Sequence, residues 1–322
     1  MKRTVVLIFS LTALIARGAN LGEPLVFTGT CDASTATALS GDLFVVANDE
    51  DNLLRFYRTS QPGKPVQTFD LRPLLSLKGK SEMDLEGAAH LGDKVFFISS
   101  HGRNAEGKFA PNRHRFFALE FSSGTNGTKV QLSGKPYTDL SADLASDRRY
   151  ARFHLAEAAA LPPKATGGFN IEALTDTPEG ALLIGFRSPV PEGRALMAPL
   201  LNPNEVITGR PPKFGDPLLL DLGGLGLRGV SSTGKGYYLL AGPVEGHTSS
   251  HLYLWAGGTA KPQLLQEAKF HKINPEGICL LGVGGGSDLL VVSDDGSRKI
   301  GGKECKTLPE AERQFRAYHL QP

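Results

Sequence analysis

The sequence predicts an all-β fold, a β-propeller of five blades in which each blade is a four-stranded antiparallel sheet. A short polar opening, two apolar runs, a polar exit and a third apolar run recur five times along the chain. The recurrence has a period of roughly 50 residues, which is typical of propeller blades. Glycine, aspartate and proline separate the runs, as expected for tight turns between short strands.

The first two copies show the pattern most clearly. The first copy comprises the opening 32–34, the apolar run 43–46, the polar exit 48–52 and the apolar run 53–57. The second copy comprises, in the same order, residues 84–87, 94–98, 100–103 and 115–119. The other three copies open at 170–172, 226–229 and 274–277, and their third strands are expected at 194–198, 251–255 and 314–318.

A fourth, outer strand is expected after four of the copies, at 65–69, 130–132, 217–220 and 262–265. Three of these segments begin with proline, which suits an outer edge because no inward ladder bond is needed there. The last copy has no such segment of its own. Residues 25–29 precede the first copy, and we expect them to supply the missing outer strand and close the ring.

The openings at 84 and 170 are much farther apart than the others, which predicts an insertion at about 135–168. Within it, residues 139–160 place apolar side chains among charged ones, a pattern typical of a short helix or lid. A sixth, degenerate blade is the alternative interpretation of this interval.

The first 18 residues have the basic start, short apolar run and small final residues of a secretory signal peptide. Cleavage would leave residues 19–322 as a single propeller domain, secreted or periplasmic, with no contact to the membrane. An uncleaved N-terminal anchor is the alternative. The formal net charge is +2 and the basic residues are scattered, so a nucleic acid partner is not expected. We expect a monomer that binds a small polar molecule.

The three cysteines allow one disulfide. Chain direction alternates between neighbouring strands of a blade. The connections that lead into the innermost strands therefore lie on the same face of the ring as the loops between second and third strands. Cys31 lies in the first kind of segment and Cys305 in the second, and their blades adjoin in a closed ring. We therefore expect a disulfide between Cys31 and Cys305, and a buried, apolar role for Cys279 in an inner strand.

The same alternation brings the openings and the polar exits to one face near the central axis. Alignment of the openings places five residues at equivalent positions around the ring: Ser34, Glu86, Glu172, Arg228 and Glu276. The exits add Asp49, Asp51, His101, Arg103, Arg187, Asp294 and Asp295.

Converging carboxylates repel one another unless a cation or hydrogen bonds compensate them. We therefore expect Ca²⁺ or another divalent cation near the axis, held by four carboxylates: Glu86, Glu172, Glu276 and Asp294. The amide oxygens of Asn170 and Asn274 suit the same hard ion. In the alternative interpretation, each glutamate accepts hydrogen bonds from the neighbouring blade and only locks the ring together.

Five residues of the openings and exits are expected to bind the polar ligand: Asp49, Arg103, Arg187, Arg228 and Asp295. His101 is the candidate for general acid or base catalysis, because imidazole serves either role near neutral pH. No nucleophile can be paired with His101 from spacing, so an ordinary loop histidine is the alternative.

Five motifs carry a resemblance to a known family: Cys-Asp-Ala-Ser at 31–34, Asp-Leu-Glu-Gly-Ala-Ala at 84–89, Ser-His-Gly-Arg-Asn at 100–104, Gly-Phe-Asn-Ile-Glu at 168–172 and Ser-Asp-Asp-Gly at 293–296. In this order they resemble the bacterial domain-of-unknown-function family numbered thirty-six sixteen, over essentially the whole mature chain. The resemblance implies an exported, propeller-like protein and leaves its activity open.

The acidic openings and the Ser-Asp-Asp exit are also similar, more weakly, to esterase-like phytase and lactonase propellers, whose members hold metal ions at the propeller mouth. This similarity implies metal roles for Glu86, Glu172, Glu276 and Asp294, while Arg228 departs from an all-acidic ring. The leading hypothesis is a binding protein for a small polar ligand, with a divalent cation at the glutamate-lined face. A metal-assisted hydrolase of phosphoesters or lactones and a protein-interaction platform are the alternatives.

Overall fold

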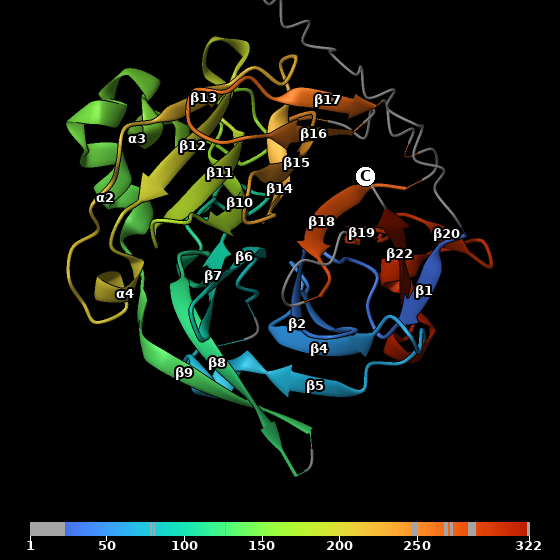
Figure 1. Cartoon of the computed structure of the whole chain (residues 1–322). Helices are drawn as coiled ribbons and strands as arrows, with labels where there is room; N and C mark the ends of the chain where they lie inside the picture. The colour runs from blue at the N-terminus through green and yellow to red at the C-terminus, as the bar shows by residue number, and fades with distance from the viewer. Residues whose placement is uncertain are drawn as a thin grey trace, which may run out of the picture.

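The computed structural model describes residues 23–77, 79, 81–125, 127–245, 250–266, 270, 273–282 and 288–320. Five four-stranded antiparallel sheets surround a central axis (Figure 1), which confirms the predicted five-bladed propeller. The long interval between the second and third openings contains helices and the long outer strand of the second blade, so a sixth blade is excluded. The proposed signal peptide lies outside the described residues.

Four blades run from the innermost to the outermost strand in chain order. Their strands are β2 (Thr35–Ser40), β3 (Leu43–Ala47), β4 (Leu53–Arg58) and β5 (Gln67–Asp70); β6 (Leu85–Leu91), β7 (Lys94–Ser99), β8 (Phe116–Gly124) and β9 (Gly127–Tyr137); β10 (Asn170–Asp176), β11 (Leu182–Ser188), β12 (Ala195–Leu200) and β13 (Leu218–Leu220); and β14 (Gly226–Ser232), β15 (Tyr237–Gly242), β16 (His251–Trp255) and β17 (Gln263–Gln266).

The fifth blade joins the two ends of the chain. It contains β18 (Pro275–Leu280), β19 (Leu289–Ser293), β22 (Gln314–Leu320) and, as its outer strand, β1 (Leu25–Thr28). β1 runs antiparallel to β22, with Leu25 opposite Ala317 and Thr28 opposite Gln314. The expected contribution of the N-terminal segment to the last blade is therefore confirmed, and the ring closes through backbone hydrogen bonds.

A disulfide reinforces this closure. Cys31 follows β1 and bonds to Cys305, which comes directly after the short hairpin of β20 (Lys299–Ile300) and β21 (Lys303–Glu304). Both cysteines are fully buried, and the predicted pairing is present. Cys279 is a buried free thiol on β18, and burial raises its pKa to about 12.

The hydrophobic core lies between the blades, because alternate residues of a strand face opposite sides of its sheet. On β7, Phe97 stacks on Phe117 and faces the first blade, whereas Phe96 stacks on Phe116 and faces the third. The ring centroids are 5.6 and 5.5 Å apart, respectively. Each blade is thus held on both faces, which fixes the relative positions of the inner strands.

Small residues let the inner strands approach one another closely. An added Cβ on Gly87 of β6 would lie 2.8 Å from the Cβ of Leu174 on β10. An added Cβ on Gly277 of β18 would lie 2.7 Å from Val292 Cγ2 and 3.0 Å from the backbone nitrogen of Ala36 on β2. Any larger side chain would push the blades apart at the axis.

Short helices occur only outside the sheets in the described part of the chain. α2 (Leu140–Ser146), a 3₁₀ turn (Arg148–Phe153) and α3 (Leu155–Ala158) bury apolar side chains against the second and third blades. Figure 1 shows α2 and α3 at the outer side of the third blade. α1 (Leu71–Leu74) and α4 (Pro203–Val206) are single turns between strands. None of the described helices is long and apolar enough to span a bilayer.

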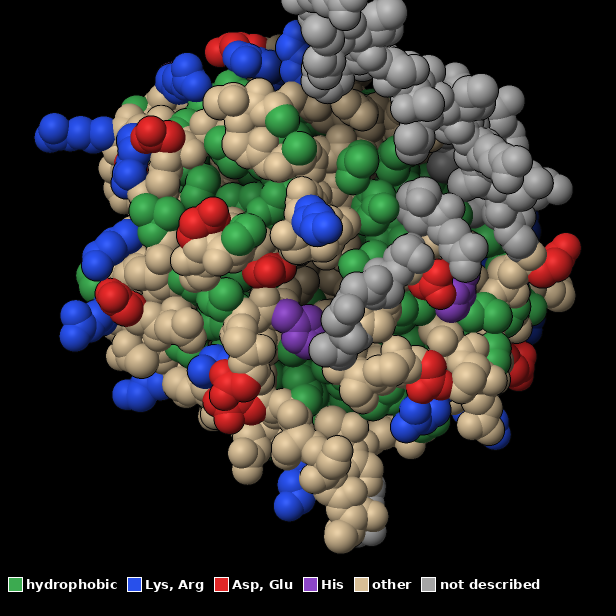
Figure 2. Space-filling view, in the orientation of Figure 1, with side chains coloured by type: hydrophobic (Ala, Val, Ile, Leu, Met, Phe, Trp, Pro, Cys, Tyr) green, Lys and Arg blue, Asp and Glu red, His purple; other side chains and the backbone are tan. Residues whose placement is uncertain are grey.

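Charged side chains are mixed over the surface. On the face drawn in Figure 2, Lys and Arg lie among Asp and Glu, with apolar and polar surface between them.

Candidate cation site at the mouth of the propeller

Four inner strands carry a β-bulge at the same place. The strand register shifts between Leu85 and Gly87 on β6, and the corresponding shifts on β10, β14 and β18 fall at 171/173, 227/229 and 275/277. The extra residue is in each case the one that the aligned openings singled out: Glu86, Glu172, Arg228 and Glu276. A bulge changes the direction of a side chain locally, and here each of four bulges carries one charged residue of the same cavity.

A cavity of about 590 Å³ lies at this end of the axis. It is lined by Asp49, Glu50, Glu82, Asp84, Glu86, Ala105, Arg113, Pro162, Pro163, Lys164, Asn170, Glu172, Arg187, Arg228, Glu276, Asp294 and Lys306. Eight of these residues are acidic and five are basic, an excess of three negative charges when all are ionised. The cavity therefore favours cations or protons.

Two arginines already compensate two of the glutamates. Arg187 Nη1 donates to Glu172 Oε1 at 2.8 Å, and both side chains are buried. Arg228 Nη1 donates to Glu276 Oε1 in a short ion pair. Glu172 and Glu276 thus have guanidinium partners, so a metal ion is not required to balance their negative charge.

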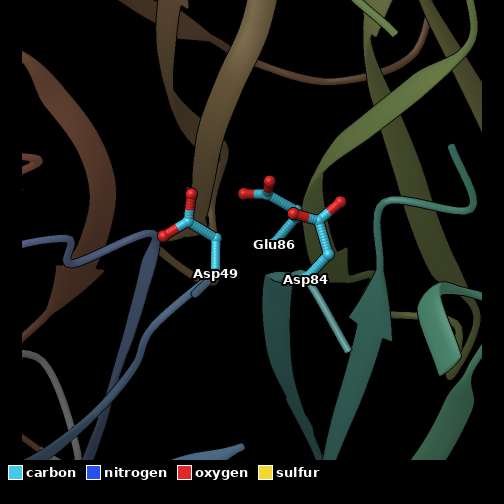
Figure 3. Close-up of side chains that lie close together, drawn as sticks. All are labelled: Asp49, Asp84 and Glu86. Carbon is cyan, nitrogen blue, oxygen red and sulfur yellow. The ribbon is translucent and has the colours of Figure 1, made fainter. Parts of the chain in front are cut away.

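Three other carboxylates, those of Asp49, Asp84 and Glu86, form a compact group that we call the cation group (Figure 3). One oxygen from each of Asp49, Asp84 and Glu86 lies within 4.8 Å of the others. Asp49 comes from the exit after β3, Asp84 directly precedes β6, and Glu86 is the bulged residue of β6. Asp84 has a left-handed backbone conformation (φ 58°), which is uncommon outside glycine. Residues from two neighbouring blades thus meet at one point.

Arg113 compensates part of the negative charge of this group through an ion pair with Asp84. Its Nη1 lies 2.9 Å from Asp84 Oδ2, and its Nη2 lies 2.8 Å from Glu82 Oε1. Asp49 and Glu86 have no ion-pair partner among the described residues.

The protonation behaviour reflects this crowding. Burial and then the charge of Glu276 raise the pKa of Asp49 well above its usual value. Burial and then the charge of Glu172 do the same to the pKa of Glu86. The pKa of Asp84 rises to about 6 and that of Glu276 to about 7, mainly through burial. Without a bound cation, this group binds protons more readily than isolated carboxyls do.

Several buried oxygens in the cavity wall have no hydrogen-bond donor among the residues that the structure describes. They are Asp49 Oδ1, Asn170 Oδ1 and Glu172 Oε2. Asn170 and Glu172 are only 6 % and 4 % exposed, and Asn170 Nδ2 donates to the other oxygen of Glu172. Buried polar atoms without partners are costly, and these three are all acceptors, so their missing partner is a cation or a donor.

Eight residues proposed from the sequence line this one cavity: Asp49, Glu86, Asn170, Glu172, Arg187, Arg228, Glu276 and Asp294. Within the cation group, Glu86 is one of the four metal ligands expected from the sequence, and Asp49 is one of the residues expected to bind the polar ligand. Asp294 stands apart, where Asn274 Nδ2 and the Gly296 amide donate to it at 3.0 and 2.8 Å.

Asn274 and three other proposed residues do not line the cavity. Arg103 donates to the carbonyls of Ala159 and Gly107 and so joins two loops. Asp295 is buried in ion pairs with Arg316 and Arg298, at 2.6 and 3.1 Å. His101 is 1 % exposed, and burial together with neighbouring His114 lowers its pKa to about 3, so it stays neutral.

Sequence reasoning did not single out Asp84, Glu82, Arg113, Lys164 and Lys306 as site residues. Asp84 could have been found, because it opens the second copy only two positions before Glu86. Arg113 and the two lysines come from long connecting segments, where spacing gives no indication of position.

Residues 120–306 match the sequence profile of a family described as "Protein of unknown function (DUF3616)". No curated protein matches the sequence.

Among solved structures, the fold is similar to several propellers. The PQQ-bound aldose sugar dehydrogenase of Streptomyces coelicolor has 13% identity and a TM-score of 0.47, with 96% of this chain and 99% of that chain covered. The gluconolactonase XC5397 of Xanthomonas campestris has 12% identity and a TM-score of 0.41, with 96% and 93% covered. The glutaminyl cyclase of Myxococcus xanthus has 11% identity and a TM-score of 0.47, with 94% and 96% covered. At these values the similarities say nothing about ligand or activity.

Proposed function

Because the chain belongs to DUF3616, a family of proteins of unknown function, we propose its function from its own geometry: it binds a small polar ligand together with a divalent cation at the propeller mouth. The observation that carries this proposal is the group of Asp49, Asp84 and Glu86 oxygens within 4.8 Å of one another. The unpartnered oxygens of Asn170 and Glu172 in the same cavity are the second, independent support.

Calcium suits this set of donors best. Ca²⁺ binds six to eight oxygens, from carboxylates, amide carbonyls and water, and tolerates irregular geometry. The cavity supplies the carboxylates of Asp49, Asp84 and Glu86 to the cation, and it leaves the unpartnered oxygens of Asn170 and Glu172 to the ligand. The remaining coordination positions would be filled by water or by oxygens of the ligand. Of the four metal ligands expected from the sequence, only Glu86 is kept. Glu172 and Glu276 already bind arginines, and Asp294 accepts hydrogen bonds from neutral donors.

The composition of the cavity disfavours catalysis by a hydroxyl, thiol or imidazole nucleophile. The described residues that line it include no serine, threonine, cysteine or histidine, whereas carboxylates and lysines, which can also act as nucleophiles, are present. A metal-assisted hydrolase acting through cation-bound water is the enzymatic alternative that we retain.

We further propose that the protein is exported. The Cys31–Cys305 disulfide supports this, because such bonds persist in oxidising compartments.

The test measures cation binding directly. Purified protein is treated with a chelator, and its melting temperature and calorimetric titration are recorded with Ca²⁺. We expect Ca²⁺ to raise the melting temperature, and the double variant Asp49→Asn/Glu86→Gln to lose that rise. Asp93→Asn is the matched control, because Asp93 is exposed on the turn between β6 and β7, at the other end of the strands. Absence of any Ca²⁺ effect, or an equal effect in the double variant, would contradict the proposal.

A panel of phosphoester and lactone substrates examines the enzymatic alternative. Turnover that requires Ca²⁺ and is lost in the double variant would establish a hydrolase at this same site.

A further inference from the structure

The cavity at the mouth is too polar for an apolar ligand. Of the 17 described residues that line it, 13 are charged and one is Asn170, and the other three are Ala105, Pro162 and Pro163. No aromatic ring is among them, so stacking on a planar ligand is not available from the described residues. Recognition must therefore come from charges and hydrogen bonds.

Most of the charges around the cavity already have partners. Arg113, Arg187 and Arg228 each form an ion pair with at least one carboxylate of the wall. The divalent cation that we propose would bind to Asp49, Asp84 and Glu86. Lys164 and Lys306 are the basic residues left, and in the described part of the chain neither forms a salt bridge.

Lys306 is held at the cavity by structure on both sides. It directly follows Cys305, whose disulfide ties this segment to Cys31 at the start of the first blade. Its backbone amide donates to the Gly296 carbonyl at 3.1 Å. Burial and then the charge of Asp294 raise the pKa of nearby Asp32 to about 8, and the charge of Lys306 opposes this rise.

Lys164 is placed by a tight segment that follows α3. The Ala165 amide donates to the Pro162 carbonyl at 3.0 Å, and the Gly168 amide donates to the Ala165 carbonyl at 2.7 Å. Arg103 Nε donates to the Ala159 carbonyl at 3.0 Å, which joins this segment to the loop after β7.

We propose that the ligand of this site is a small hydroxylated organic anion, a carboxylate or a phosphate monoester. Its negative charge is balanced by Lys164 and Lys306, and its hydroxyl groups donate to the free oxygens of Asn170 and Glu172. This inference rests on the proposed function, because the bound cation reduces from three to one the excess of negative charge that would otherwise repel an anion.

The test compares three probes of similar size by calorimetric titration of the Ca²⁺-loaded protein: D-gluconate, D-glucose 6-phosphate and neutral D-glucose. We expect at least one anion to bind about 10-fold more tightly than glucose, which is about 1.4 kcal/mol. The double variant Lys164→Met/Lys306→Met should lose this preference, while Lys164→Arg/Lys306→Arg should retain it. Which of the two anions binds distinguishes a carboxylate ligand from a phosphate ester.

The Ca²⁺-dependent rise in melting temperature distinguishes failure of the anion proposal from failure of the proposed cation site. If that rise persists in the methionine variant and the anion preference is lost, the inference holds. If the rise is present in the wild type but neither anion binds, or glucose binds equally well, the inference is overturned and the cation site remains. If Ca²⁺ has no effect, the proposed function itself fails.

Discussion

Arg187 and Glu172 form a buried ion pair on neighbouring strands of the third blade, with Nη1 and Oε1 2.8 Å apart. Removal of one partner leaves the other charge buried and uncompensated, which typically costs about 3–5 kcal/mol. We therefore expect Arg187→Met to lower the free energy of unfolding by that amount, and Arg187→Met/Glu172→Gln to recover a large part of it. Urea denaturation at pH 7 measures both.

The control for this prediction is Arg58→Met. Arg58 and Asp42 form an ion pair at 2.6 Å, but both side chains are substantially exposed. An exposed pair contributes about 0–1 kcal/mol. Equal losses in Arg58→Met and Arg187→Met would show that burial of the Arg187 pair has no energetic consequence.

Glu86 and Glu276 occupy equivalent bulges, yet their neutralisation should have opposite effects on stability. Glu86 has no ion-pair partner in the described part of the chain and lies among like charges, so Glu86→Gln should raise the melting temperature of chelated protein. Glu276 binds Arg228, so Glu276→Gln leaves a buried guanidinium without a charged partner and should lower the melting temperature. Thermal denaturation in excess chelator measures both signs. A decrease for Glu86→Gln would mean that repulsion around Glu86 is already relieved.

The sequence was sufficient to predict the ring and the common position of its axial residues. Periodic apolar runs determine how many blades form, and strand alternation determines which segments share a face. Glu86, Glu172, Arg228 and Glu276 therefore reach one cavity as expected.

The direction of individual side chains was not predictable in the same way. A bulge depends on the register between two strands. The sequence Glu86-Gly87 alone does not indicate that the strand register shifts there. Asp84 joins Asp49 through a left-handed backbone conformation that its sequence context does not indicate. His101 also has a left-handed backbone, and tertiary packing buries it instead of presenting it to the cavity.

Asp32 provides a prediction for the effect of pH on stability. Burial and then the charge of neighbouring Asp294 raise its pKa to about 8, from an ordinary value of 3.8. Between these two values the folded state binds more protons at Asp32 than the unfolded state does, so this group makes stability fall as pH rises. Asp32→Asn should therefore increase the free energy of unfolding at pH 8 and increase it much less at pH 4.

The measurement for Asp32 is urea denaturation at both pH values in the presence of chelator, so that cation binding does not contribute. Asp93→Asn is the control, since burial has only a minor effect on Asp93 and its pKa is lowered by Lys94. A gain for Asp32→Asn that is equal at pH 4 and pH 8 would rule out titration of Asp32 as the cause.

The Cys31–Cys305 disulfide should stabilise the fold and also position one wall of the site. It closes a loop of 274 residues, and removal of a native disulfide typically costs about 2–5 kcal/mol. We expect Cys31→Ala/Cys305→Ala to show this loss in urea denaturation and to weaken anion binding, because Lys306 follows Cys305 directly. The Ca²⁺ effect should persist, since the cation group belongs to the first two blades. Cys279→Ala removes a buried thiol outside the disulfide and is the control. Unchanged anion affinity in the double variant would show that Lys306 does not depend on the disulfide for its position.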